Sequence, residues 1–393
     1  MDGKRVVASA DASVLKVADQ CTCHAWNKDR SMLAYCPNNN ELHILVKGSD
    51  GQWIDQYNLK EHDQVITSMD WAWETNRIVT CSMDRNAYVW KFEDDTWKPT
   101  LVILRQNRAC THVRWSPQEN KFAVASGAKC VSVCYFEEEN DWWVSKVIKE
   151  DKAKVPIFGS TVTSVAWHHG NILLATGSSD NKVRLISTAV KGVDSKRPKS
   201  MFGVDKPAFG KVVAEFESTG WVEGLAFSPS GATVAWTGQD SSIYSVDIGD
   251  MDAPIDQSAV QVLRLSCSPL RCILFLSESE IVCGGYDMTP MVFKREKGGW
   301  VRGKNLDESK SKGGEKKQSA VSSAFAKFEN VSKLGVEQRD TALKTVHQNC
   351  ISCIVLAGST TGGVAECSTS GLDGRVCIWE QQCISEAFKN LSI

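Results

Sequence analysis

A turn residue followed six positions later by an apolar or aromatic residue recurs seven times along these 393 residues. The clearest copy runs from His62 to Trp90. In it, apolar and polar residues alternate over 65–71, which predicts a half-buried strand. Two more strands are predicted at 77–82 and 87–92, on either side of a tight turn at Asp84. A fourth is predicted at 100–104, so one copy is a unit of four short strands.

The seven copies keep two spacings, which makes the repeat the strongest constraint on the fold. A large aromatic that ends the first strand lies 12 to 14 residues before most of the turns (Trp26, Trp71, Trp115, Trp167, Phe227 and Phe275). The turn and apolar pairs are Asn40/Val46, Asp84/Trp90, Lys129/Tyr135, Asp180/Ile186, Asp240/Val246, Asp287/Phe293 and Asp373/Trp379. Repeats of this kind are typical of radial four-stranded blades. We therefore predict an all-β fold, a single seven-bladed WD40 β-propeller over residues 1–393.

Ring closure and composition constrain the fold further. One of the short segments 6–8 and 14–17 is expected to supply the outer strand of the last blade, which removes exposed sheet edges. The formal charge of −2 argues against a surface built for nucleic acid. No apolar run is long enough for a membrane span and no signal-peptide core precedes the repeats, so a cytoplasmic protein is expected. The fifteen cysteines lie mostly within strands and are expected to be free, buried thiols.

The spacing of 86 residues between the last two turns predicts an insertion, placed at 294–346, between blades six and seven. Its first part, 294–317, holds nine Lys or Arg against four Asp or Glu and is expected to have no core. A helix is predicted at 319–332, because an apolar stripe recurs there at helical spacing (Val321, Ala324, Phe325, Phe328 and Val331). This stripe needs a partner surface, or else the helix folds back on the propeller rim. The basic loop 191–211 is expected to be an exposed excursion, and 380–393 forms a tail beyond the repeats.

One group of polar residues in the second copy could be interpreted as a hydrolase triad. The structural hydrogen-bond network of a WD blade has the same offsets as His62, Thr80, Ser82, Asp84 and Trp90. A buried aspartate requires such a network of partners. Later copies have an aspartate at the same position, and we interpret these copies as decayed forms of that network. The residues are Asp180, Asp240, Asp287, Asp373 and, in the last copy, Trp379. No nucleophile elbow or oxyanion loop accompanies them, so no catalytic site is predicted.

Metal and phosphate sites are likewise not predicted. Two groups contain residue types that bind zinc: Cys21, Cys23 and His24, and His347, Cys350 and Cys353. Neither group has the spacing of a two-knuckle zinc site, and the members of each would not share one face of a strand. The glycine-rich segment 358–363 lacks the Gly-Lys-Ser/Thr ending that cradles phosphates. No cofactor is expected.

Several blade segments closely resemble those of the WD-repeat subunit (subunit 1) of the actin-related protein 2/3 complex. They are 23–30 (CHAWNKDR), 36–39 (CPNN), 59–62 (LKEH), 76–81 (NRIVTC), 84–90 (DRNAYVW), 97–105 (WKPTLVILR), 134–136 (CYF) and 139–144 (ENDWWV). The resemblance extends from about residue 9 to Trp379 and includes the position of the insertion.

This resemblance implies a non-catalytic structural subunit that supports nucleation of branched actin filaments. The propeller would scaffold neighbouring subunits, and the inserted helix would contact the mother filament or the activating nucleation-promoting factor. Two alternatives remain open. A generic WD adaptor, such as a ligase substrate receptor or a chromatin platform, would differ in its partners. An enzyme using the central funnel would need a cluster of titratable residues at one mouth.

Overall fold

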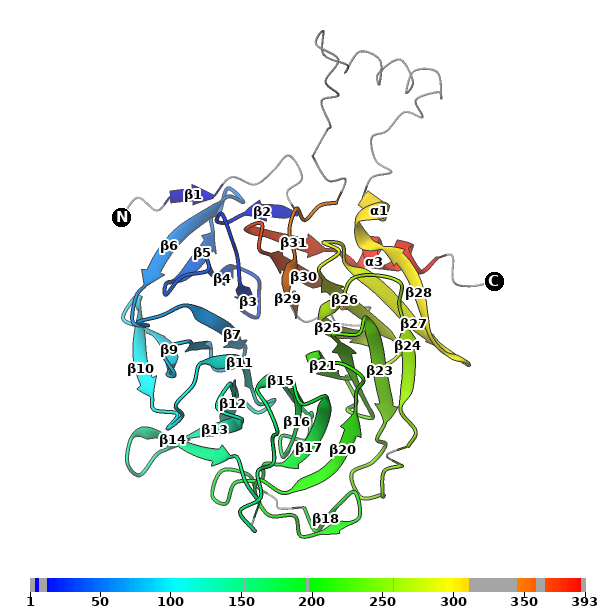
Figure 1. Ribbon diagram of the computed structural model, residues 1–393. Coiled ribbons are helices and arrows are strands. Elements are labelled where there is room, and N and C mark those ends of the chain that lie inside the picture. Colours follow the sequence, from blue (N-terminus) through cyan, green and yellow to red (C-terminus); the bar gives the residue numbers. More distant parts are fainter. Residues whose placement is uncertain are drawn as a thin grey trace, which may run out of the picture.

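The computed structural model describes residues 4–6, 13–151, 153–195, 198–256, 258–310, 345–357 and 365–389. Seven antiparallel sheets stand around a common axis in chain order (Figure 1). The prediction of an all-β, seven-bladed propeller is confirmed.

The first three blades each consist of consecutive strands. Blade one contains β3 (Cys23–Trp26), β4 (Met32–Cys36), β5 (Leu42–Lys47) and β6 (Trp53–Leu59). Blade two contains β7 (Ile66–Ala72), β8 (Arg77–Ser82), β9 (Ala87–Glu93) and β10 (Thr96–Val102). Blade three contains β11 (Cys110–Trp115), β12 (Lys121–Ser126), β13 (Cys130–Glu137) and β14 (Trp142–Ile148). The strand predicted at 100–104 covers residues 96–102 in the structure. It can include Pro99, because it is the edge strand of the blade and the missing backbone N–H of proline needs no partner there.

The remaining blades depart from this plan at two places. Blade four contains β15 (Val162–Trp167), β16 (Leu173–Ser178), β17 (Lys182–Ser187) and β20 (Val212–Glu217), with the hairpin β18 (Ser200–Met201) and β19 (Val204–Asp205) before its last strand. Blade five contains β21 (Val222–Phe227), β22 (Thr233–Gly238), β23 (Ser242–Asp247) and β24 (Gln261–Arg264). Blade six contains β25 (Leu270–Ser277), β26 (Glu280–Gly285), β27 (Met291–Glu296) and β28 (Gly299–Asn305). Blade seven contains β29 (Ile351–Leu356), β30 (Cys367–Gly371), β31 (Arg375–Trp379) and, from the N-terminus, β2 (Val14–Lys16).

Pairing of the two termini closes the ring. β2 pairs antiparallel with β31, with Val14 opposite Cys377 and Lys16 opposite Arg375, so the prediction that an N-terminal segment completes the last blade is confirmed. The preceding strand β1 (Lys4–Val6) adds a fifth strand to blade one. Gly374 is required at this closure, since it has a φ of +69° and a Cβ there would lie 1.8 Å from the carbonyl oxygen of Ala18.

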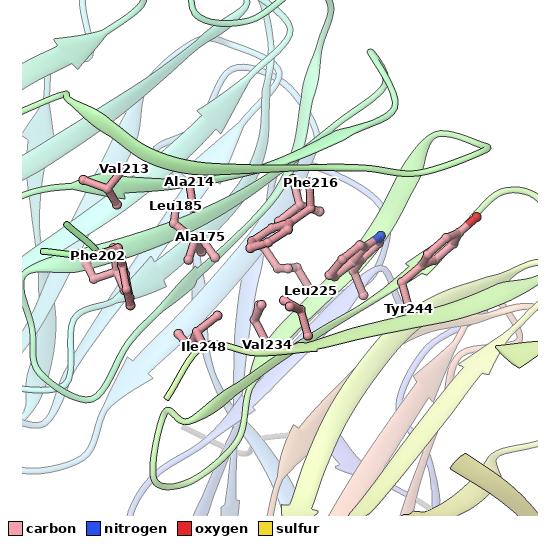
Figure 2. Close-up of a cluster of buried hydrophobic side chains, with 14 of the residues drawn as sticks. Ala175, Leu185, Phe202, Val213, Ala214, Phe216, Leu225, Val234, Tyr244 and Ile248 are labelled. Carbon is pink, nitrogen blue, oxygen red and sulfur yellow. The ribbon is translucent and has the colours of Figure 1, made fainter. Parts of the chain in front are cut away.

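The hydrophobic core lies between blades. The described residues form seven clusters of buried side chains, and each spans one of the seven junctions between neighbouring blades. Figure 2 shows the junction of blades four and five, where Leu185 and Phe216 face Leu225 and Val234. A blade is therefore stabilised mainly by its neighbours, and closing the ring buries the last pair of faces.

Hydroxyl groups on the innermost strands also tie neighbouring blades together. Thr111 donates to the carbonyl of Val162 (2.6 Å) and Thr163 to that of Val222 (2.5 Å). Ser352 of blade seven donates to the carbonyl of Cys21 of blade one (2.7 Å). These bonds join neighbouring innermost strands around the axis.

The predicted boundary of the insertion at residue 294 is wrong. Residues 294–305 complete the outer hairpin of blade six, in which Trp300 is buried and its indole N–H donates to Ser245 (2.9 Å). A polar, glycine-containing segment suits an outermost strand, because one side of it faces water. The chain leaves blade six through helix α1 (Leu306–Lys310).

The expectation that 191–211 is an exposed excursion is also wrong. Within this segment Met201 and Phe202 are buried in the cluster between blades four and five, as Figure 2 shows for Phe202. Asp194 is buried beside Lys121 of blade three. Other charged residues of the segment are exposed, such as Lys199 and Lys206, while a few apolar side chains anchor it, a pattern that net composition hides.

The C-terminal tail forms helix α3 (Gln381–Phe388) on the outside of blades six and seven, beside α1 (Figure 1). Its buried face consists of Ile384, Ala387 and Phe388, which pack with Leu306 and Trp379. The tail thus covers the place where the insertion leaves the propeller. In the described part of the chain, no helix combines the length and apolar character needed to cross a membrane.

Candidate functional site

The five polar residues predicted in blade two form one connected hydrogen-bond chain. Nδ1 of His62 lies 2.7 Å from Oδ2 of Asp84, and Nε2 lies 2.8 Å from the Thr80 hydroxyl. The indole N–H of Trp90 donates to the same hydroxyl (2.9 Å). The Ser82 hydroxyl accepts the backbone N–H of Asp84 (3.1 Å) and donates to the carbonyl of Gln64 (2.8 Å). Because an ionised carboxylate only accepts, Nδ1 of His62 carries the proton shared with Asp84.

The electrostatics of this chain suit a structural role. Burial alone would raise the pKa of Asp84, but hydrogen bonds from His62 and from the backbone N–H groups of Asn86 and Asp63 hold it below its usual value. Thr80 is fully buried, and its hydroxyl already has two partners. The arrangement joins the inner loop, the second strand and the third strand of one blade, and a substrate could not reach the hydroxyl.

Blade seven holds a second complete network, which the sequence interpretation missed. His347 lies 3.2 Å from Asp373 through Nδ1 and 2.8 Å from the Thr369 hydroxyl through Nε2. The indole of Trp379 donates to Thr369 (2.9 Å). The interpretation of Asp373 and Trp379 as a decayed copy is therefore wrong. The signal was present in the sequence, since His347 precedes Asp373 by 26 residues where His62 precedes Asp84 by 22.

The aspartates of blades four, five and six keep the turn but use other partners. Asp180 pairs with Arg184 (2.9 Å) and accepts from the N–H of Gly159 (2.8 Å). Asp240 accepts from the Tyr244 hydroxyl (2.6 Å). Asp287 accepts from the N–H of Ser268 (3.1 Å). What persists in these blades is the position of the carboxylate, while its partners differ from one blade to the next.

A further network links blade one to blade seven at the ring closure. The ring nitrogens of His24 lie 3.0 Å from the Ser370 hydroxyl and 2.7 Å from the Ser368 hydroxyl. The indole of Trp26 also donates to Ser368 (2.8 Å). Burial, followed by repulsion from His347 and Arg114, lowers the pKa of His24 to about 3, so this imidazole is neutral. Sequence spacing could not reveal this contact, because its members lie 342 to 346 residues apart.

The pH dependence of stability provides a test of the blade seven network. Although burial opposes a charged imidazole, Cys377 and Asp373 raise the pKa of His347 to about 9, from an ordinary value of 6.5. A raised pKa stabilises the fold fully below pH 6.5, and this contribution is lost as the pH rises through 9. We expect the difference in melting temperature between the wild type and His347→Gln to shrink over that interval. A difference that stays constant from pH 6 to about 9.5 would contradict a charged His347.

The axis of the ring contains two cavities that share a narrow waist. The upper cavity, about 570 Å³, lies where the innermost strands of all seven blades begin. The lower cavity, about 320 Å³, lies where these strands end in their large aromatic residues. Arg114, Leu225, Ile273 and Ile354 line both cavities and form the waist. Polar and charged side chains therefore do gather at one mouth of the funnel, a feature that the sequence could not locate.

The other sequence candidates are not brought together into a site. Within the described ranges, no group of three or more His, Cys, Asp or Glu is arranged to hold a metal ion. All fifteen cysteines are free thiols, twelve of them buried. The inserted helix predicted at 319–332, with Val321, Ala324, Phe325, Phe328 and Val331, lies outside the described residues. The described chain ends at α1 before the insertion and resumes at residue 345, ahead of blade seven.

Comparison with known proteins agrees with this architecture. The family model described as "WD domain, G-beta repeat" matches residues 53–91 and 154–187. Actin-related protein 2/3 complex subunit 1A-B of Xenopus laevis is 44% identical over 377 residues, which cover 95% of this chain and 97% of that protein. Subunit 1A of Arabidopsis thaliana is 43% identical, over 97% of this chain and 99% of that protein. Subunit 1 of Schizosaccharomyces pombe is 41% identical, over 91% and 95%. With relatives this similar over almost the whole of both chains, the protein belongs to the family of actin-related protein 2/3 complex subunit 1.

Proposed function

We propose that this protein is a non-catalytic structural subunit of an actin-related protein 2/3 complex and supports the nucleation of branched actin filaments. The observation that carries the proposal is the full-length similarity to proteins named as subunit 1 of that complex. The closed ring, with a buried cluster at each junction and hydroxyl bonds around its axis, supplies the rigidity that a scaffold requires. The family implies a cytoplasmic location on the actin cytoskeleton.

A tagged pull-down from the source cell, with the partners identified by mass spectrometry, tests this function. We expect two actin-related proteins and the other small subunits to be recovered in equal amounts. Recovery of ligase or chromatin components without any actin-related protein would overturn the proposal and favour a generic WD adaptor. Immunofluorescence with an actin stain tests the location, since a signal that does not follow branched actin would contradict it.

Within this role, we propose that the inserted segment contacts the mother filament or the activating nucleation-promoting factor through the apolar stripe of its predicted helix. Two observations support this. The stripe includes two aromatic residues, Phe325 and Phe328, which are suited to anchoring a helix in a groove. The segment leaves the ring through α1, at the outside of blades six and seven rather than at the axis.

Replacing Phe325 and Phe328 together by alanine is expected to lower branch density in a reconstituted actin assembly assay several-fold. The melting temperature of the isolated chain should stay within about one degree of the wild type, because under this proposal the two side chains serve a partner and not the propeller core. Ser323→Ala, off the apolar stripe, is the matched control and should change neither quantity. A loss of several degrees in the double variant would instead place the helix against the propeller body.

A further inference from the structure

Two cysteines face each other across the first two strands of blade one. In the ladder formed by β3 and β4, Cys23 lies directly opposite Cys36. Residues directly opposite in an antiparallel pair have Cα atoms about 4.5 or 5.5 Å apart, and their side chains lie on the same face of the sheet. Both separations fall within the range of about 4.4–6.8 Å that a disulfide can bridge. The strands therefore hold these two residues at a distance that a disulfide spans without movement of the backbone.

This arrangement sets the pair apart from the other cysteines. Among the strands that the structure describes, it is the one ladder position at which two cysteines are partners. The thiol of Cys81 also forms a hydrogen bond with that of Cys110. Those two residues belong to different blades, because β8 pairs with β7 and β9 while β11 pairs with β12. No ladder fixes the distance between their backbones.

The two thiols of blade one also interact directly. Both are buried in the cluster between blades one and two. The Cys23 thiol donates a hydrogen bond to the Cys36 sulfur, which raises the pKa of Cys23. The same bond lowers the pKa of Cys36 below its usual value, although burial opposes this change. Cys36 is therefore the better nucleophile of the two, because the thiolate is the reactive form of cysteine.

The pair lies beside a space that a small oxidant can enter. Cys23 lines the upper cavity of the axial channel, about 570 Å³ in volume, and so do Gln20 and Asn38. These two polar residues are exposed and hydrogen-bonded to each other, so this part of the cavity wall reaches the surface. The Cys36 sulfur lies behind the wall, 3.7 Å from the carbonyl oxygen of Ile66, which also lines the cavity. Hydrogen peroxide is only slightly larger than water, so a cavity of this volume admits it.

We propose that Cys23 and Cys36 are a redox modification site, at which hydrogen peroxide converts the two thiols into a disulfide. The Cys36 thiolate attacks one peroxide oxygen. An S–O bond forms, the O–O bond breaks and hydroxide leaves, which produces a sulfenic acid. The hydroxide removes the proton of Cys23, and the resulting thiolate attacks the Cys36 sulfur. The S–S bond forms as the S–O bond breaks, and the second hydroxide takes up the proton that Cys36 released on ionising. Overall, two thiols are oxidised and one peroxide is reduced to two molecules of water.

The disulfide would join the two inner strands of the blade at which the ring closes. β3 lies beside β29 of blade seven, and the cluster between these blades includes Trp26 of the same strand. In the cytoplasmic location that the family implies, glutathione and thioredoxin reduce disulfides, so the bond would be transient. The pair thus allows a reversible covalent change next to the ring closure, which the scaffold role does not require.

The test treats the folded full chain with one molar equivalent of hydrogen peroxide, blocks the remaining thiols and digests the protein with trypsin. Cleavage after Lys28 and Arg30 separates the two cysteines, so the disulfide joins peptide 17–28 to peptide 31–47. We expect mass spectrometry to find this linked pair, with the bond assigned by fragmentation to Cys23 and Cys36. Two of the fifteen thiols should be lost and recovered with dithiothreitol, while the far-UV circular dichroism stays unchanged.

Variants separate the roles of the two cysteines. Cys36→Ser and Cys36→Ala should give no linked pair and lose thiols about tenfold more slowly, because the nucleophile is absent. Cys23→Ser should instead accumulate a sulfenic acid on Cys36, which dimedone captures. Cys134→Ser is the matched control, since Cys134 is also buried but lies opposite Phe122, and it should give the same linked pair as the wild type.

Other outcomes would overturn the proposal. Cys21 and Cys353 act electrostatically on Cys23, and a bond assigned to either of them would place the reactive pair elsewhere. A linked pair that forms only after unfolding in urea would mean that peroxide does not reach these thiols in the folded ring. Unchanged thiol content in the treated wild type would have the same meaning. The wild-type measurements decide these points even if substitutions at the two buried positions prevent folding.

Discussion

Replacing Lys121 by methionine should destabilise the propeller by about 3–5 kcal/mol, because it leaves a buried carboxylate without its cation. Nζ of Lys121 lies 2.6 Å from Oδ2 and 2.7 Å from Oδ1 of Asp194, and both side chains are almost completely buried. The ammonium also donates to the carbonyl of Thr188 (3.2 Å) and lies 5.3 Å from the centre of the Trp167 ring. The pair joins blade three to the segment that follows the third strand of blade four, so its loss also weakens a blade junction. Denaturant unfolding of the full chain measures the effect.

Two control variants make this prediction specific. Nζ of Lys28 lies 2.7 Å from Oε1 of Glu74, and this ion pair also links two blades, but both of its side chains are exposed. Lys28→Met should therefore lower the free energy of unfolding by at most about 1 kcal/mol. The double variant Lys121→Met with Asp194→Asn should recover part of the loss, because no buried charge remains. A cost for Lys121→Met no larger than that for Lys28→Met would show that water reaches Asp194.

Replacing Trp379 by alanine should cost about 3–5 kcal/mol, the range expected for truncation of a fully buried aromatic. The indole is completely buried in the cluster between blades six and seven, and its N–H donates to Thr369 of the blade seven network. The same side chain packs in the cluster that anchors α3. The expected result is a lower free energy of unfolding and earlier exposure of the C-terminal helix to proteolysis.

Trp142→Ala is the matched control, because that indole is 59% exposed at the start of the outer strand of blade three. It should change the free energy of unfolding by less than about 0.5 kcal/mol. Trp379→Phe, which keeps most of the apolar area but loses the hydrogen bond to Thr369, should fall between the two. Equal effects of the two alanine variants would contradict the central place of Trp379 in the blade junction.

Several structural features were predictable because they depend on local periodicity. The turn at Asp84, the strands on either side of it and the repeat of this unit follow from alternating burial and from residues that favour tight turns. The blade two network could be predicted from His62, Thr80, Asp84 and Trp90, since all four lie within one unit. Its counterpart in blade seven was missed because the insertion disturbs the spacing before His347 and hides the start of the repeat.

The outer strands were the least predictable elements. β28 has two glycines and two charged residues, and only Trp300 among its residues indicates burial. Outermost strands face water on one side and carry little hydrophobic signal, so composition alone assigned β28 to a solvated insertion. The same reason explains the segment 191–211, where a few apolar residues, among them Met201 and Phe202, anchor a segment rich in charged residues.

The sequence by itself determined the number of blades and the network of blade two, because both depend on constant offsets inside one repeat unit. It also determined the closure of the ring by an N-terminal strand, because an incomplete last blade would leave exposed sheet edges. Only the tertiary structure decided which residues meet across the ring. It brought His24 to Ser368 and Ser370, Lys121 to Asp194, and Arg114 to the waist of an axial channel formed by all seven blades. These contacts join residues far apart along the chain, and their partners are set by how rigid blades pack around an axis, which no local pattern encodes.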